Sequence, residues 1–278
     1  MSYDVLGAGA LNYAPCRYGN SRILFRGPER RLDAPYVAFL GGTETYGKFI
    51  KTPFPALVES SLGVNCINFG IPNAGIDVLA NEGFLIDAAL GAQISVVQIV
   101  GTQNLSNRFY TVHPRRNDRF ISASPLLSSI YPEVDFSEFH FTRHMLNILY
   151  GVSPQRFAVV RQELQEAWMS RMKLLLRRIQ GKAVLLWLAD CSPPEASDVQ
   201  TNPANNSDPL FVTRQMLEQL EAHAKEFVQV VLSQKALAAG TQGMMFSEME
   251  APAAQKLLGP QAHGEAAQVL TGMLRRYV

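Results

Sequence analysis

An apolar run and a glycine turn follow one another in the stretch Tyr36-Val37-Ala38-Phe39-Leu40-Gly41-Gly42-Thr43-Glu44-Thr45-Tyr46-Gly47. The apolar run predicts a buried strand, and residues 54–62, which end before a glycine, predict a helix. Two glycines between a strand and a helix lift the next hydroxyl, that of Thr43, to the sheet edge where open α/β folds bind ligands. The same pattern also fits a tight turn in which the glycines serve only steric needs.

Four more apolar runs alternate with helical patterns along the chain. With the first, they cover residues 37–40, 64–69, 95–100, 183–189 and 227–232. Helices are expected at residues 54–62, 78–90, 154–179, 213–226 and 264–277. Runs without polar alternation are typical of strands covered on both faces. The order predicts a single α/β domain over residues 1–278, a flavodoxin-like three-layer sandwich whose five-stranded, mainly parallel sheet has helices on both faces.

Three regions fall outside this alternation. Residues 1–34 form an arm that carries five arginines, and residues 104–150 form a long polar and aromatic insertion after the third strand. Residues 191–210 are rich in Pro, Asn, Ser and Asp and are expected to form a surface loop. A long insertion in a compact α/β domain is often a lid or a binding element, and contact within a homo-oligomer is the alternative.

Composition and charge argue against several classes of protein. The formal net charge of +1 gives no global field for nucleic acid or an anionic membrane. No apolar run approaches the roughly 20 residues of a membrane helix, and the first residues lack the features of a secretory signal. The three cysteines are scattered, without metal-binding spacing. We therefore expect a cytoplasmic protein with reduced thiols, no metal and no cofactor.

Four short motifs stand at the ends of predicted elements. They read Gly41-Gly42-Thr43, Asn68-Phe69-Gly70, Gly101-Thr102-Gln103-Asn104 and, before the last helix, Pro260-Gln261-Ala262-His263. Their order over residues 36–275 resembles the SGNH (GDSL-type) hydrolase superfamily, in which the nucleophile is a serine and an aspartate precedes the histidine. Here Thr43 stands at the serine position and Pro260 at the aspartate position, so the chain resembles a divergent member.

The resemblance implies a site for ester hydrolysis or acyl transfer. Thr43 would be the nucleophile and His263 the general base, while Gly70 and Asn104 would line the oxyanion hole. Gly42 and Glu44 flank the nucleophile position and are expected in the same site. Without its aspartate the histidine lacks an orienting acid, and the loss of such a partner lowers rates by about four orders of magnitude.

Each of these residues also has a structural alternative. Glu44, Asp190 and Asp208 are candidates for the missing orienting acid, and their spacing does not select one. Thr43 and His263 also suit helix caps, and Asn104 suits a loop that binds backbone.

The insertion concentrates arginines, histidines and aromatic residues directly after Asn104. His113, Arg115 and Arg116 are the candidate ligand-binding residues, because arginine forks bind carboxylate, sulfate or phosphate and aromatic faces suit sugar rings. Ion pairing with acidic residues of the same segment is the alternative.

Three functions remain open at the level of sequence. One is an SGNH-like esterase or acyltransferase that acts on a small or carbohydrate-linked acyl ester. Another is a catalytically reduced relative that binds a polar or anionic, saccharide-like ligand in the same cleft. The third is a scaffold whose insertion and arm build an oligomer.

Overall fold

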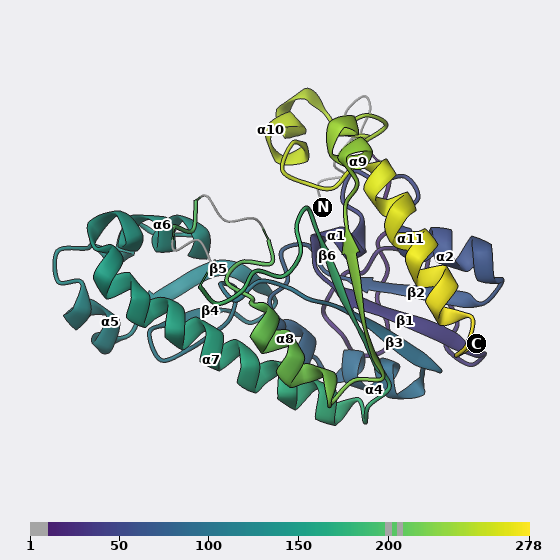
Figure 1. Cartoon of the computed structure of the whole chain (residues 1–278), viewed down its shortest axis with the longest axis horizontal. Helices are drawn as coiled ribbons and strands as arrows, with labels where there is room; N and C mark the ends of the chain where they lie inside the picture. The colour runs from purple at the N-terminus through teal and green to yellow at the C-terminus, as the bar shows by residue number, and fades with distance from the viewer. Residues whose placement is uncertain (1–10, 198–201, 205–207) are drawn as a thin grey trace.

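A five-stranded parallel sheet lies at the centre of the computed structural model, which describes residues 11–197, 202–204 and 208–278 (Figure 1). The strand order is β2-β1-β3-β6-β7, as in flavodoxin-like folds. The strands are β1 (Tyr36–Gly41), β2 (Asn65–Gly70), β3 (Ile94–Gln98), β6 (Ala183–Ala189) and β7 (Glu226–Val231). The predicted α/β class is confirmed.

The burial of each strand follows its place in the sheet. Every residue of β1, β3 and β6 is buried, because helices cover both faces of these inner strands. The edge strand β7 instead alternates buried and exposed residues along its second half. The apolar runs of the sequence therefore identified all five strands but did not distinguish the inner strands from the edge strands.

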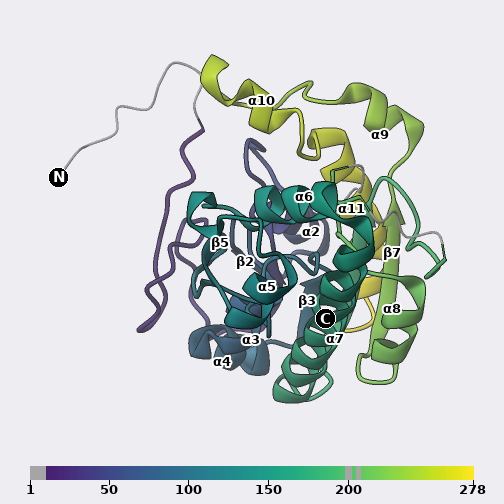
Figure 2. The ribbon, with the colours of Figure 1, turned by 90° about the vertical axis from the view of Figure 1, so that its left-hand side faces the viewer.

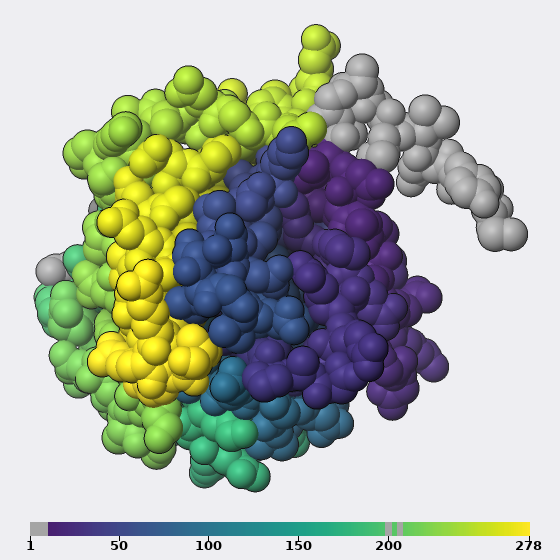
Figure 3. Space-filling model, turned by 90° about the vertical axis from the view of Figure 1, so that its right-hand side faces the viewer, coloured from purple at the N-terminus to yellow at the C-terminus, as the bar shows by residue number. Residues whose placement is uncertain are grey.

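Helices cover both faces of the sheet. On one face lie α2 (Phe54–Leu62) and α11 (Pro260–Leu274), which are side by side in Figure 3 and share an apolar cluster with Val37 and Phe39 of β1. On the other face lie α3 (Ile76–Asn81), α4 (Gly83–Gly91), α7 (Pro154–Arg178) and α8 (Arg214–Glu221). Short helices α1 (Thr43–Tyr46), α9 (Gln234–Ala239) and α10 (Ala251–Ala254) lie in the connections.

Three predicted helices have different bounds in the structure. The helix expected at residues 78–90 is two helices, because Glu82 adopts an extended conformation between α3 and α4. The helix expected at residues 213–226 ends at Glu221, and residue 226 already belongs to β7. The last helix begins at Pro260, since proline suits the first helical turn, so that His263 lies inside it.

The insertion forms a small unit with its own apolar cluster (Figures 1 and 2). It contains the hairpin β4 (Tyr110–His113) and β5 (Arg116–Ala123), then α5 (Pro125–Ile130), the short 3-10 helix η1 (Phe136–Glu138) and α6 (Thr142–Val152). Its cluster includes the first half of α7, so this helix joins the insertion to the sheet.

The arm and the predicted loop are only partly described. The arm packs Tyr18 and Phe25 against Phe69 and Phe84, and residues 1–10 lie outside the described residues. Residues 198–201 and 205–207 of the loop predicted at 191–210 also lie outside them. Within the described part of the chain, no helix combines the length and the apolar character needed to cross a membrane.

Candidate functional site

A cavity of about 910 Å³ opens beyond the carboxyl ends of the parallel strands. We call it the carboxyl-edge cleft and define it by the polar residues that line it, which are Thr43, Glu44, Asn73, Gln98, Gln103, Asn104, Asp118, Thr142, Arg143, Asp190, Asp208, Gln255 and Lys256. They come from the strand ends, the insertion and the segment before α11. The site is at the edge that parallel α/β sheets use for ligands.

Gln98 at the end of β3 holds the glycine turn in place. Its side-chain Oε1 accepts hydrogen bonds from the Gly42 amide at 3.0 Å and from the Thr45 hydroxyl at 2.6 Å. A Cβ at Gly41 would lie 2.5 Å from this same oxygen, so the turn needs glycine there. Sequence reasoning missed Gln98, although a glutamine within an apolar run was an available signal.

Thr43 turns its hydroxyl toward Asn73 of the following loop. Thr43 Oγ1 accepts the Asn73 amide proton at 2.9 Å and donates to Asn73 Oδ1 at 3.3 Å. The Asn73 side chain in turn donates to Asp118 Oδ2 of the insertion at 3.2 Å. A chain of hydrogen bonds therefore joins the predicted nucleophile position to an acid of the insertion.

Glu44 is the carboxyl group beside this turn. Burial raises the pKa of Glu44, and the nearby negative charge of Asp208 raises it further, whereas the hydrogen bond from Gln98 Nε2 at 2.9 Å opposes the shift. A raised pKa favours the neutral acid, which can donate a proton or a hydrogen bond to a ligand.

Asn104 lines the cleft, and both ends of its side-chain amide are already bonded. Its Nδ2 donates to the Asn73 carbonyl at 3.3 Å, and its Oδ1 accepts from the Thr142 hydroxyl at 2.7 Å. Gly75 makes this arrangement possible, since a Cβ there would lie 1.5 Å from the Asn104 carbonyl oxygen. Asn104 therefore connects the insertion to the sheet edge.

The opposite wall carries charged groups with unused hydrogen-bonding capacity. Arg143 pairs with Asp208 at 3.1 Å, and Gln103 Nε2 donates to the same carboxylate at 3.3 Å. Gln103 Oε1 and Arg143 Nε are buried without a hydrogen-bond partner. Buried polar atoms are rarely left unpaired, so these two side chains carry unsatisfied hydrogen-bonding capacity beside the cleft.

His263 does not contact Thr43. It is 2% exposed inside α11, its Nδ1 accepts the Phe54 amide proton at 3.1 Å, and its ring stacks on that of Phe54. Burial lowers its pKa to about 3. The histidine thus caps the first turn of α2. All five histidines fall within the described residues, and none of them lines the cleft.

Gly70 also lies apart from the lining of the cleft. Its amide donates to Asn68 Oδ1 at 2.9 Å, so this proton is already used. A Cβ at Gly70 would lie 2.1 Å from the Tyr46 amide nitrogen. The glycine lets β2 approach α1, which is a packing role.

The tip of the insertion hairpin points away from the cleft. His113 Nδ1 accepts the amide protons of Arg115 and Arg116 at 3.2 Å, and Arg115 lines a different cavity. The insertion reaches the cleft through Asp118, Phe141 and Arg143 instead. Sequence reasoning placed the insertion near the site but could not tell which of its residues face it.

The fold and cleft define a flavodoxin-like α/β protein with a polar site at the carboxyl edge of its sheet. A family model described as "Domain of unknown function (DUF6473)" matches residues 1–278, and the chain belongs to this family. No curated protein matches its sequence. Among the described residues, no three His, Cys, Asp or Glu side chains are grouped to hold a metal ion.

Two solved structures are similar at low identity. A gut microbial diltiazem-metabolizing enzyme is 11% identical with a TM-score of 0.41, over 86% of this chain and 46% of that one. The chain therefore spans about half the length of that enzyme. A lipase from a goat rumen metagenome is 10% identical with a TM-score of 0.36, over 88% of this chain and 97% of that one.

Proposed function

We propose that the carboxyl-edge cleft binds a small, hydroxyl-rich ligand of the saccharide class. One observation carries the proposal: acids, amides and a guanidinium line one large cavity from which every histidine is absent. A bound polyol needs donors and acceptors around it, whereas acyl hydrolysis through Thr43 needs a base in contact with its hydroxyl.

The chemistry of the lining suits such a ligand. Asp118 and Asp190 accept hydrogen bonds from hydroxyl groups, and the neutral form of Glu44 donates one. Gln103 and Arg143 line the cleft, and each has a buried polar atom that no protein group pairs. Phe141, which is 45% exposed, offers an apolar ring to the carbon face of a sugar.

To test this proposal, a panel of neutral, acidic and amino sugars is screened by thermal shift. The sugars that bind are then measured by calorimetry. We expect Asp190→Asn to weaken the best ligand at least about tenfold, as for a lost hydrogen bond to a charged group. Arg116→Ala is the matched control, because Arg116 is exposed and lies outside the cleft. A panel without any binder, or equal losses in both variants, would overturn the proposal.

Acyl transfer is the second candidate. The Thr43 hydroxyl lines the cleft and accepts a backbone amide, and Glu44, the next residue, places a carboxyl group in the same cleft. In this reaction Oγ1 attacks the ester carbonyl while the Glu44 carboxylate takes the hydroxyl proton. The C–O bond of the ester breaks, the leaving alcohol receives this proton, and water or an acceptor hydroxyl then takes the acyl group from Thr43. The order of motifs that resembles the SGNH hydrolases supports Thr43 as the nucleophile, but not Glu44 as the base.

Turnover of p-nitrophenyl acetate separates the two candidates. If the second holds, Thr43→Val and Glu44→Gln each abolish turnover, whereas His263→Asn retains it. Equal rates in wild type and all three variants would remove acyl transfer and leave the binding proposal standing.

A further inference from the structure

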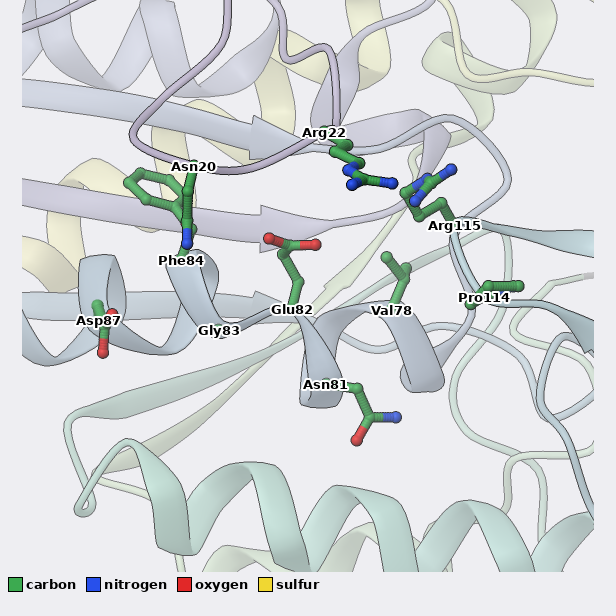
Figure 4. A pocket seen from close by; sticks show the side chains of 10 residues that line it. All are labelled: Asn20, Arg22, Val78, Asn81, Glu82, Gly83, Phe84, Asp87, Pro114 and Arg115. Atoms are coloured by element: carbon green, nitrogen blue, oxygen red, sulfur yellow. The ribbon is translucent and has the colours of Figure 1, made fainter.

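A second cavity, of about 380 Å³, lies between the arm, the α3–α4 junction and the hairpin tip (Figure 4). We call it the arginine cavity, and its charged and polar lining residues are Asn20, Arg22, Asn81, Glu82, Asp87 and Arg115. It shares no lining residue with the carboxyl-edge cleft. The two cavities are therefore separate sites.

Two arginines meet at one end of this cavity. Arg22 comes from the arm and Arg115 from the hairpin tip, and Figure 4 shows their side chains close together. Within the described residues, neither guanidinium has a carboxylate within 4.0 Å or a hydrogen-bond acceptor. Neighbouring arginines of the arm are paired, Arg30 with Glu59 and Arg31 with Asp33. Two unpaired like charges side by side favour an anion between them.

The backbone beneath both arginines is fixed. Asn117, fully buried, accepts the amide protons of Gly75 and Val78 and donates to the carbonyls of His113 and Pro114, which ties the hairpin tip to the start of α3. On the arm, Arg22 sits between the buried residues Ser21 and Ile23. Such preorganisation lowers the entropic cost of holding a ligand.

The other residues of the cavity limit the ligand. Glu82 lies across from the arginines, and Asp87 lies at the far end, beside Phe84 and Asn20 (Figure 4). These acids repel a molecule that is anionic throughout, and they accept hydrogen bonds from hydroxyl groups. We propose that the arginine cavity binds a small phosphate monoester, with its phosphate between Arg22 and Arg115 and its hydroxyl groups toward Glu82 and Asn20.

Calorimetric titration of the full chain with glycerol phosphate and with inorganic phosphate, at constant ionic strength, tests the proposal. We expect saturable binding, tighter for glycerol phosphate, which Arg22→Ala and Arg115→Ala each weaken at least about tenfold. Arg116→Ala is the control on the same hairpin and should bind as wild type does. Arg143→Ala reports whether phosphate enters the carboxyl-edge cleft instead.

Three outcomes would overturn it. One is the absence of saturable binding at millimolar concentrations, and another is an equal loss in Arg115→Ala and Arg116→Ala, which indicates only a general positive field. The third is a loss confined to Arg143→Ala, which assigns the phosphate to the other cleft. Because Arg22 and Arg115 are exposed, thermal unfolding of their variants should match that of wild type, so that lost binding does not reflect lost folding.

Discussion

At the scale of single residues, His263 shows that a residue that matches a sequence motif can lie outside the site. The sequence presents it as a base, but the structure buries its ring between α11 and the start of α2, where it accepts the Phe54 amide proton. A buried acceptor of this kind must stay neutral, and burial accordingly lowers its pKa to about 3.

The lowered pKa of His263 predicts how stability depends on pH. Between pH 6.5, the ordinary pKa of histidine, and about pH 3, His263 is protonated in the unfolded chain but neutral in the folded chain. The free energy of unfolding therefore falls as the pH falls through this range. From about pH 7 to about pH 5 this residue should cost about 2 kcal/mol of the free energy of unfolding. Urea denaturation at both pH values measures it.

His263→Asn is the matched variant for this measurement. The Asn side chain keeps an oxygen that can accept the Phe54 amide proton, but it does not titrate. The variant should lose less stability than wild type over the same pH interval, whatever its stability at neutral pH. An equal loss in both proteins would contradict the assignment.

Glycine supplies a second prediction, at the scale of the elements that meet around the cleft. A Cβ at Gly75 would collide with the Asn104 backbone, so Gly75→Ala should destabilise the protein by about 3 kcal/mol, as overpacking does. Gly264→Ala, within α11 and with open space around it, should instead stabilise by about 0.5–1 kcal/mol. Thermal unfolding compares them, and similar shifts would refute the close approach.

The arm makes a third prediction at the same scale. The Arg26 guanidinium donates to the carbonyls of Gly47, Ile50 and Lys51 at 2.6–2.9 Å and so holds the connection from α1 to α2. Arg26→Ala should cost about 3 kcal/mol in urea denaturation, because it leaves carbonyls without their donor. Arg17→Ala, an exposed arginine of the same arm, should change stability by less than about 0.5 kcal/mol. Equal effects would show that the arm does not brace this connection.

At the scale of the whole molecule, α7 contributes to the apolar clusters of both the insertion and the sheet. Its first half, with Phe157 and Leu164, belongs to the insertion cluster, and its second half, with Trp168, belongs to the main cluster. Trp168 also donates from Nε1 to the Val100 carbonyl at 2.9 Å. Both tryptophans, Trp168 and Trp187, report on the main cluster by fluorescence.

Because α7 contributes to both clusters, a substitution that destabilises the insertion should also destabilise the main cluster, which contains the tryptophans. Leu149→Ala in α6, fully buried in the insertion cluster, should destabilise by about 2–5 kcal/mol and lower the urea midpoint of tryptophan fluorescence. Ile148→Ala, whose side chain is 41% exposed, should leave that midpoint nearly unchanged. If Leu149→Ala shifts only the circular dichroism, the insertion unfolds alone and the single-domain prediction fails.

The sequence by itself determined the α/β class, the five strands, the long helix and the glycine turn below Thr43. Those features depend on local apolar patterns and on backbone sterics, and both are determined by residues that are close together in the sequence. Three predicted helices have different bounds in the structure. Capping and short turns depend on a few residues, and the contacts of these residues are with segments far away in the sequence. The hairpin and α6 of the insertion carried too weak a pattern to be recognised.

Only the tertiary structure decided which side chains share a cavity. Thr43, Glu44, Asn104 and Asp118 meet at the carboxyl edge, whereas His263 faces α2 and Arg115 joins Arg22 at the far side of the hairpin. Adjacent residues on a helix or a strand point to different sides, so a position in the chain does not fix the direction of its side chain. That direction depends on packing between elements that are far apart in the sequence.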